Sequence, residues 1–325
     1  MSKPTRVLVL GGGPDAERQV SIDSATGVHQ GCLDAGVDAT LLIVDEPTVE
    51  EIQSWNTDLV FPVLHGKFGE GGQLQRRLEA AGVPFVGCES GPARIAMDKI
   101  ATKLWAAKLG IPTLEAMILG EDLVHDPENA VCPIGPPMVI KPVADGSSCG
   151  LYICSDHDAW VSALSAISES DSPPVSMIEP MIVGRELTVG VIDDGAGSLK
   201  ALPIVEIAPA SGTYDYQAKY ERNDTVYTVN PDLTDELESD LRDWSLSICN
   251  AIGVRHLARV DFMLDEDGKA WVLELNTMPG FTATSLLPKA AASIGLSMHE
   301  LCAHLVNAAS ADKNTESKSS RASTH

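Results

Sequence analysis

The chain has little positive charge. Its 325 residues include 23 Lys and Arg against 46 Asp and Glu, which gives a formal net charge of −23 at pH 7 and a pI of about 4.6. A surface with this charge repels phosphate backbones and anionic lipid headgroups, so we expect neither nucleic acid nor membranes as partners. Any polyanion that the protein binds therefore requires a local cluster of basic residues.

Long apolar runs and paired cysteines are also missing. The longest apolar run near the N-terminus, at residues 7–10, is too short for a signal peptide or a membrane span. Seven cysteines are scattered without a C-x-x-C pair, which favours reduced thiols over a disulfide framework or a zinc site. Together these absences predict a cytoplasmic protein.

The N-terminal third of the chain alternates between strand and helix patterns. Buried strands are predicted at 6–10, 38–44 and 59–64, and amphipathic helices at 73–81 and 92–109. This alternation is typical of an α/β unit with a parallel sheet.

The pattern changes after Pro112, where strands come in hairpin-like pairs. Such pairs are predicted at 138–154 and 175–192, which indicates an α+β unit. A third part contains a long helix that begins near Thr234. From Ala308 onward the chain is polar, and this composition predicts a disordered tail.

The most informative stretch is a hairpin late in the chain. Two alternating runs are joined by Asp-Glu-Asp-Gly at 265–268, which predicts an antiparallel pair. This turn would place Arg259 opposite Glu274 and Asp261 opposite Val272. The other face of the hairpin is predicted to be core, and it carries Val260, Phe262, Leu264, Trp271, Leu273 and Leu275.

The polar face of this hairpin would gather three oxygen donors and a guanidinium. The donors are Asp261, Glu274 and Asn276, and the guanidinium belongs to Arg259. Hard oxygen ligands of this kind suit Mg²⁺, which prefers one or two carboxylates completed by water and phosphate. A solvated sheet face with an Arg–Glu pair is the alternative. A Pro-Gly loop within 277–286 follows, and its backbone N–H groups can face a ligand at this edge.

Two glycine-rich segments have competing interpretations. Lys141 precedes a Gly/Ser loop at 142–150 that suits phosphate, although no Walker A motif occurs and a plain hairpin turn has the same composition. Gly11, Gly13 and Ala16 match a dinucleotide-binding fingerprint, which would indicate a nicotinamide-dependent oxidoreductase. That match is weak, because no acidic residue follows at the expected spacing.

Eight motifs, in register along the chain, resemble the ATP-grasp superfamily and, within it, the D-alanine–D-alanine ligases. They are GGPDAERQVS at 12–21, HGKFGEGG at 65–72, MDK at 97–99, VIKPVADGSSCG at 139–150, IEPMIVGRELTVG at 178–190, SGTYDYQAKY at 211–220, RVDFML at 259–264 and LELNTMPGFTATSL at 273–286. The resemblance implies an α/β and α+β fold with a Rossmann-like N-terminal domain over 1–96. Two antiparallel-sheet domains, over 97–183 and 184–307, would hold ATP between them, ahead of the tail at 308–325.

The resemblance also implies a reaction. ATP phosphorylates the carboxylate of one D-alanine, and the amine of a second D-alanine then displaces phosphate to give a dipeptide for peptidoglycan synthesis. Two Mg²⁺ ions, which Mn²⁺ can replace, would neutralise the charge that develops. A homodimer is common in the family. The nearest alternatives are ligases that join D-alanine to D-lactate or D-serine, and Tyr220 favours D-alanine.

Site residues are carried over from the resemblance in three groups. The nucleotide group comprises Lys99 and Lys141 at the triphosphate, Ser147 and Ser148 in the phosphate loop, Glu179 and the backbone near Ile182 at the adenine, Glu186 at the ribose and Lys219 at the transferred phosphate. The magnesium ligands would be Asp261, Glu274 and Asn276, with Glu274 bridging both ions. The catalytic group comprises Glu17, Ser147 and Tyr220 at the first ammonium, Arg259 and the Gly280 N–H at the oxyanion, Ser285 and the Leu286 N–H at the second carboxylate, and Lys219 and His65. Taken alone, His65 is better interpreted as a packing histidine.

Overall fold

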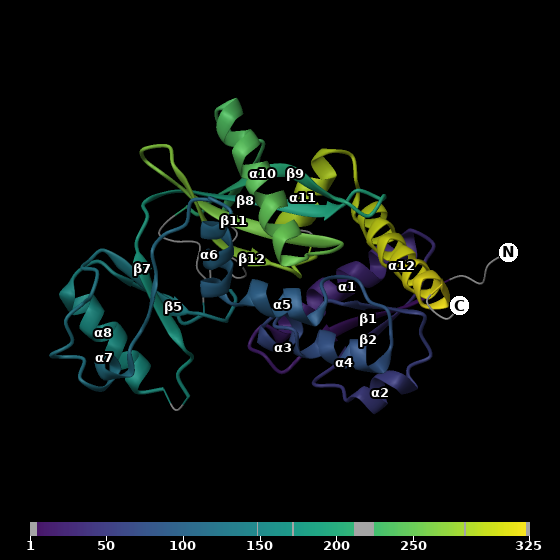
Figure 1. The fold of residues 1–325 in the computed structure, drawn as a ribbon, viewed down its shortest axis with the longest axis horizontal. Coiled ribbons are helices and arrows are strands. Elements are labelled where there is room, and N and C mark those ends of the chain that lie inside the picture. Colours follow the sequence, from purple (N-terminus) through teal and green to yellow (C-terminus); the bar gives the residue numbers. More distant parts are fainter. Residues whose placement is uncertain (1–4, 148, 171, 211–223, 283, 323–325) are drawn as a thin grey trace.

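Three sheets organise the part of the chain that the computed structural model describes, residues 5–147, 149–170, 172–210, 224–282 and 284–322 (Figure 1). The first sheet is parallel, in the order β2-β1-β3, as the alternation of strands and helices predicts. Its strands are β1 (Arg6–Gly12), β2 (Asp38–Val44) and β3 (Leu59–Pro62), and the helices beside them are α1 (Arg18–Asp34), α2 (Val49–Ser54), α3 (Lys67–Glu70) and α4 (Gln73–Ala81).

The second sheet is antiparallel, in the order β4-β7-β5-β6, and lies in a lobe at one end of the molecule (Figure 1). Its elements are β4 (Met117–Ile118), α7 (Glu121–His125), β5 (Met138–Pro142), β6 (Tyr152–Cys154), α8 (His157–Ser168) and β7 (Ser176–Pro180). Trp160 of α8 is fully buried and shares one core with Met138 and Ile140 of β5. This lobe therefore has a hydrophobic core of its own.

The third sheet is also antiparallel, in the order β10-β9-β8-β11-β12. Its elements are β8 (Gly184–Asp193), β9 (Leu199–Ala208), β10 (Val226–Val229), α10 (Asp235–Ile252), β11 (Leu257–Asp265), β12 (Ala270–Asn276) and α11 (Leu286–Ser293). The mixture of a parallel α/β unit and two antiparallel sheets confirms the predicted fold class.

Two helices from early in the chain pack on this third sheet. The predicted domain boundary at 96/97 assigns α5 (Ser90–Met97) and α6 (Lys99–Lys108) to the first and second domains. Both helices contact β12, and their apolar residues Ala93 and Ala106 share a core with the sheet, while α5 also contacts α3 and α4. The apolar stripe of each helix is buried against a sheet that follows much later in the sequence, so the two helices link the N-terminal unit to the third sheet.

The register predicted for the hairpin of β11 and β12 is wrong. Asp261 pairs with Glu274 and Arg259 with Asn276, and a bulge follows at which Phe262 pairs with Val272. The turn is longer than predicted because the Asp265 carboxylate accepts hydrogen bonds from backbone N–H groups within it.

The bulge changes which residues of β12 face the core. It leaves Leu273 unpaired and reverses the alternation of the strand. Leu273 consequently lines a cavity, and Trp271, whose indole N–H donates to Asp265 over 2.8 Å, is only partly buried. The prediction that both are core residues is therefore wrong.

The last helix, α12 (Met298–Ala322), returns to the first sheet, where it packs against α1 (Figure 1). Ala309 on this helix is buried, and the Asp312 carboxylate lies 3.0 Å from Nε2 of His256. The prediction of a disordered tail from Ala308 is wrong for residues 308–322, which continue the helix, because apolar residues of its first turns dock it; residues 323–325 lie outside the described residues. No helix in the described residues is long and apolar enough to cross a membrane.

Phe281 connects the loop after β12 to the first sheet, and its removal tests this packing. The side chain is fully buried, with its ring edge against Phe61 at 5.8 Å between centroids. We expect Phe281→Ala to lower the free energy of unfolding by about 3–5 kcal/mol, measured by denaturant titration. Val131→Ala, at a side chain that is 80% exposed, is the control and should change it by less than about 0.5 kcal/mol. Equal effects of the two changes would contradict the docking of this loop.

Candidate active site

Two cavities meet at the junction of the three sheets. The larger, of about 520 Å³, is lined by residues of the second and third sheets. The smaller, of about 120 Å³, lies between the loops of the first sheet and the end of β12. The residues that line both cavities are Lys99, Asp145, Gly146, Arg259 and Glu274. A group bound in one cavity can therefore meet a group bound in the other across this shared wall.

The cations of the larger cavity are buried and paired. Lys99, the first residue of α6, donates to the Asp145 carbonyl over 2.6 Å and lies 3.3 Å from Oε2 of Glu274. Lys141 of β5 forms an ion pair with Glu179 of β7, its neighbour in the second sheet. These partners compensate for the loss of water around each buried charge.

Arg259 and the oxygen donors lie on one face of the third sheet, as predicted. The guanidinium of Arg259 donates to both carboxylate oxygens of Asp261 over 2.8 and 2.7 Å, and Thr188 donates to the same carboxylate over 2.5 Å. Glu274 is the direct cross-strand partner of Asp261, with Asn276 two residues further along β12. This arrangement brings together the whole predicted set of oxygen donors.

This donor set fits a hard divalent cation. Two carboxylates and one amide oxygen leave room for phosphate oxygens and water, which is how Mg²⁺ is usually held. Among the described residues no three His, Cys, Asp or Glu side chains converge on one point. The protein's share of such a site is therefore Asp261, Glu274 and Asn276.

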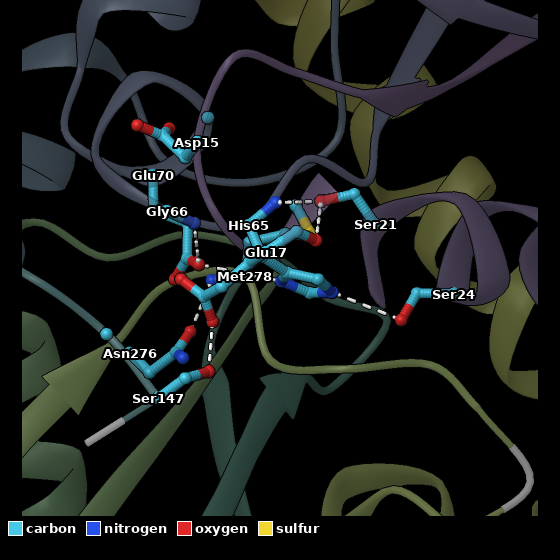
Figure 2. Close-up of polar contacts among 12 residues, drawn as sticks. Asp15, Glu17, Ser21, Ser24, His65, Gly66, Glu70, Ser147, Asn276 and Met278 are labelled. Carbon is cyan, nitrogen blue, oxygen red and sulfur yellow. Dashed lines mark hydrogen bonds and ion pairs between the residues drawn. The ribbon is translucent and has the colours of Figure 1, made fainter. Parts of the chain in front are cut away.

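A buried acidic cluster lines the smaller cavity (Figure 2). Glu17, just before α1, accepts a hydrogen bond from the Ser147 hydroxyl of the loop after β5. A Cβ atom on Gly146 would lie only 2.9 Å from Oε2 of Glu17, so the loop approaches this carboxylate closely because the residue is glycine. His65 lies beside Glu17, with its Nδ1 3.5 Å from Glu70.

The charges in this cluster shift one another's pKa values. Burial and the charge of Glu70 raise the pKa of Glu17, although the Ser147 hydroxyl and His65 oppose the shift. Burial by itself lowers the pKa of His65, but the hydrogen bond and charge of Glu70, followed by the charge of Glu17, raise it overall. A single imidazole thus stands between two carboxylates, and the cavity has an excess of negative charge that suits a substrate ammonium.

The far end of the smaller cavity is formed by the loop that leads into α11. Ser285 caps this helix, and its hydroxyl oxygen accepts from Thr282 N–H over 2.9 Å. Leu286 is the first residue of the helix, so its N–H has no partner within the helix and can bind an anion. A Cβ on Gly280 would lie 2.9 Å from the Ser285 hydroxyl, which explains glycine at this position.

The structure places most of the predicted site residues around the two cavities. The smaller cavity is lined by Glu17, His65, Ser147, Gly280, Ser285, Leu286 and Asn276, and the larger by Lys141, Glu179, Ile182, Glu186 and Asp261. Ser148, Lys219 and Tyr220 lie outside the described residues.

Sequence reasoning missed several polar residues of the site. Asp145 lies in the shared wall, and Glu70 and Tyr227 line the smaller cavity. Lys103 forms an ion pair with Glu179 over 2.7 Å. The spacing of Lys103 four residues after Lys99 was the available signal, because residues so spaced share one face of a helix.

The two facing antiparallel sheets, with a cavity between them that Lys99 and Lys141 line, define the class of ATP-grasp enzymes. Family models described as the C-terminus and the N-terminus of D-ala D-ala ligase match residues 104–307 and 44–88. The chain belongs to the D-alanine–D-alanine ligase family. This membership removes the oxidoreductase alternative. Gly12, the last residue of β1, packs against the neighbouring strand β2, where a Cβ would lie 2.3 Å from the Val44 carbonyl.

Individual relatives match along nearly the whole chain. The D-alanine–D-alanine ligase of Bordetella petrii is 38% identical over 317 residues, which cover 97% of this chain and 95% of that protein. The solved D-alanine–D-alanine ligase of Bacillus anthracis, complexed with ATP, is 31% identical with a TM-score of 0.77, over 97% of this chain and 100% of that one. A solved D-Ala:D-Ser ligase of Enterococcus faecalis is 26% identical with a TM-score of 0.75, over 94% and 100%.

The charge balance around His65 generates a prediction. In Glu70→Gln the imidazole loses its ion pair while its burial remains, so we expect the pKa of His65 to fall. An NMR titration of the imidazole would measure this change. Glu46→Gln, which removes a more exposed carboxylate near Arg77, is the control and should leave the titration unchanged. An unchanged His65 titration in Glu70→Gln would show that Glu70 does not set its charge.

Proposed function

We infer that this chain joins two molecules of D-alanine at the expense of ATP, the reaction for which its family is named. The observation that carries this inference is the wall shared by the two cavities, where Lys99, Arg259 and Glu274 face both. A phosphate group held in the larger cavity can pass there to a carboxylate held in the smaller one. The acyl phosphate made in the first step would then stay bound until the second amine attacks it.

Roles for residues of the smaller cavity follow from their charges. Glu17, hydrogen-bonded to Ser147, would hold the ammonium of the first D-alanine. Ser285 and the N-terminus of α11, at Leu286, would hold the carboxylate of the second. Between them, Arg259 and the Gly280 N–H would stabilise the oxyanion that forms when the second amine attacks the acyl phosphate.

The larger cavity would hold the nucleotide. Lys99 and Lys141 supply positive charge for the triphosphate, and Glu179 and Glu186 supply acceptors for the adenine amine and the ribose. Asp261, Glu274 and Asn276 would hold Mg²⁺, or Mn²⁺, which neutralises charge on the transferred phosphate when bound. The predicted roles of Lys219 and Tyr220, the homodimer and the cytoplasmic location stay predictions.

The reaction itself is directly testable. With ATP, Mg²⁺ and D-alanine, we expect one ADP and one phosphate for each dipeptide formed, measured by coupled ADP release and product chromatography. Formation of AMP and pyrophosphate would contradict transfer of the terminal phosphate. D-Serine and D-lactate as second substrates provide the comparison, and faster product formation with either one would favour that alternative ligase.

The assignment of Glu274 gives a second test. Glu274→Gln keeps the size of the side chain but removes the charge that faces Asp261 and Lys99, so we expect kcat to fall by about 10²–10³-fold. Glu266→Gln makes the same change in the exposed turn of the same hairpin and should stay within about twofold of the wild type. If a folded Glu274→Gln protein matched Glu266→Gln in kcat, this role would be wrong.

A further inference from the structure

Glu179 is held by two lysines that come from different parts of the fold. Its side chain lies on β7, is 3% exposed and lines the larger cavity. Lys141 from the neighbouring strand β5 pairs with one carboxylate oxygen, Oε1. Lys103 from α6 pairs with the other, Oε2, over 2.7 Å. Lys103 is not among the described residues that line the cavity, so it contacts the Glu179 carboxylate from outside the cavity.

The ammonium of Lys103 has two hydrogen-bond acceptors and one ion-pair partner. Besides Glu179, its Nζ lies 3.3 Å from the Thr113 hydroxyl and 3.2 Å from the Leu114 carbonyl. The side chain is 5% exposed, and its helix packs on the third sheet while Glu179 belongs to the second. Because two hydrogen bonds anchor the ammonium, its charge is held beside Oε2 of the Glu179 carboxylate.

We propose that Lys103 is a positioning residue for base selection, which holds Glu179 as an ionised, oriented acceptor so that the larger cavity prefers a 6-aminopurine nucleotide over a 6-oxopurine nucleotide. This proposal rests on the nucleotide role of the cavity given above. It assigns to Lys103 the discrimination between ATP and inosine triphosphate, which differ at the purine 6-position and in the proton on the adjacent ring nitrogen.

The chemistry of the carboxylate explains this preference. An ionised carboxylate only accepts hydrogen bonds, so it binds an amino group and repels a carbonyl oxygen. Each carboxylate oxygen has two lone pairs, which leaves one free for the base when the other accepts from a lysine. A protonated carboxyl group could instead donate to a 6-oxo group, and discrimination would be lost.

Burial alone would keep Glu179 protonated, and the lysines prevent this. Desolvation raises the pKa of Glu179, but Lys141 and Lys103 together bring it below its ordinary value. The charged groups in ion-pair contact with Glu179 among the described residues are these two. The other charged residues that line the cavity are Lys99, Asp145, Glu186, Arg259, Asp261 and Glu274. Without Lys103, Glu179 should therefore take up a proton at a higher pH than it does in the wild-type protein.

The test compares binding of ATP and inosine triphosphate by calorimetry without D-alanine, at pH 7.5 and pH 6. We expect wild-type protein to prefer ATP at both values. In Lys103→Met the ratio of the two affinities should fall by about tenfold to a hundredfold, the value of a charge-assisted hydrogen bond. The ratio in this variant should fall further at pH 6, whereas a purely structural role would not make the ratio depend on pH.

Lys108→Met is the matched control. It removes an exposed lysine from the same helix, where the ammonium lies over the Trp105 ring at 4.5 Å, and it should keep the wild-type ratio. If Lys103→Met does not fold, Lys103→Gln takes its place, because the amide can still donate to Thr113 and Leu114. Glu179→Gln should also lower the ratio, and adding Lys103→Met to it should have no further effect on the ratio.

Three outcomes would overturn the proposal. They are a wild-type protein without preference for ATP, a folded Lys103 variant with the wild-type ratio at both pH values, and a change in ratio of the same size in Lys108→Met. A wild-type protein that forms ADP from ATP and D-alanine but treats both nucleotides alike would overturn this inference and leave the proposed function intact. Failure to bind either nucleotide would count against the proposed function.

Discussion

The junction of the three sheets depends on ion pairs that α6 makes through one face. Lys99 and Lys103 lie four residues apart, so they project from the same side of the helix. Lys99 reaches Glu274 of the third sheet and the Asp145 carbonyl in the loop that follows the second sheet, and Lys103 reaches Glu179 within that sheet. Since α6 packs on the third sheet, these contacts hold β7 and the loop after β5 of the second sheet against the body of the protein.

The same charges that hold the junction together are those that the proposed reaction would use. Buried charges are costly unless each has a partner, and here Arg259 is held by Asp261 and Lys99 by Glu274. When a phosphate and a divalent cation enter together, the basic groups can turn to the phosphate and the carboxylates to the cation. The number of compensated charges then stays the same, so the site can be preorganised before its ligands arrive.

Sequence reasoning predicted which residues line the two cavities better than it predicted how the strands pair. The strand periods and glycine-rich loops indicated the strands and the polar face of the hairpin, because these depend on local patterns. The register failed at Asp265, whose side chain extends the turn, and at the bulge beside Leu273. Both depend on hydrogen bonds that alternation alone does not encode.

Long-range packing accounts for the other differences between the sequence-based predictions and the structure. Helix α5 lies next to the first sheet in sequence, yet its apolar side is buried against β12, and α12 returns from the end of the chain to α1. The burial of Lys103 also depends on long-range packing, because a lysine in an amphipathic helix is expected to be solvent-exposed unless its buried partner is known. Positions of this kind depend on which distant surfaces meet, and a single sequence does not specify that.

The acidity of the chain and its proposed use of ATP are compatible because the two act over different distances. In physiological salt the repulsion from surface carboxylates is screened beyond about 8 Å, so the net charge of −23 adds little to the energy of a nucleotide inside the cavity. Lys99 and Lys141 are buried, where screening is weak and each charge acts strongly on a bound phosphate. The buried lysine charges therefore dominate the electrostatic energy of a bound triphosphate. The carboxylates paired with these lysines determine how strongly they attract it.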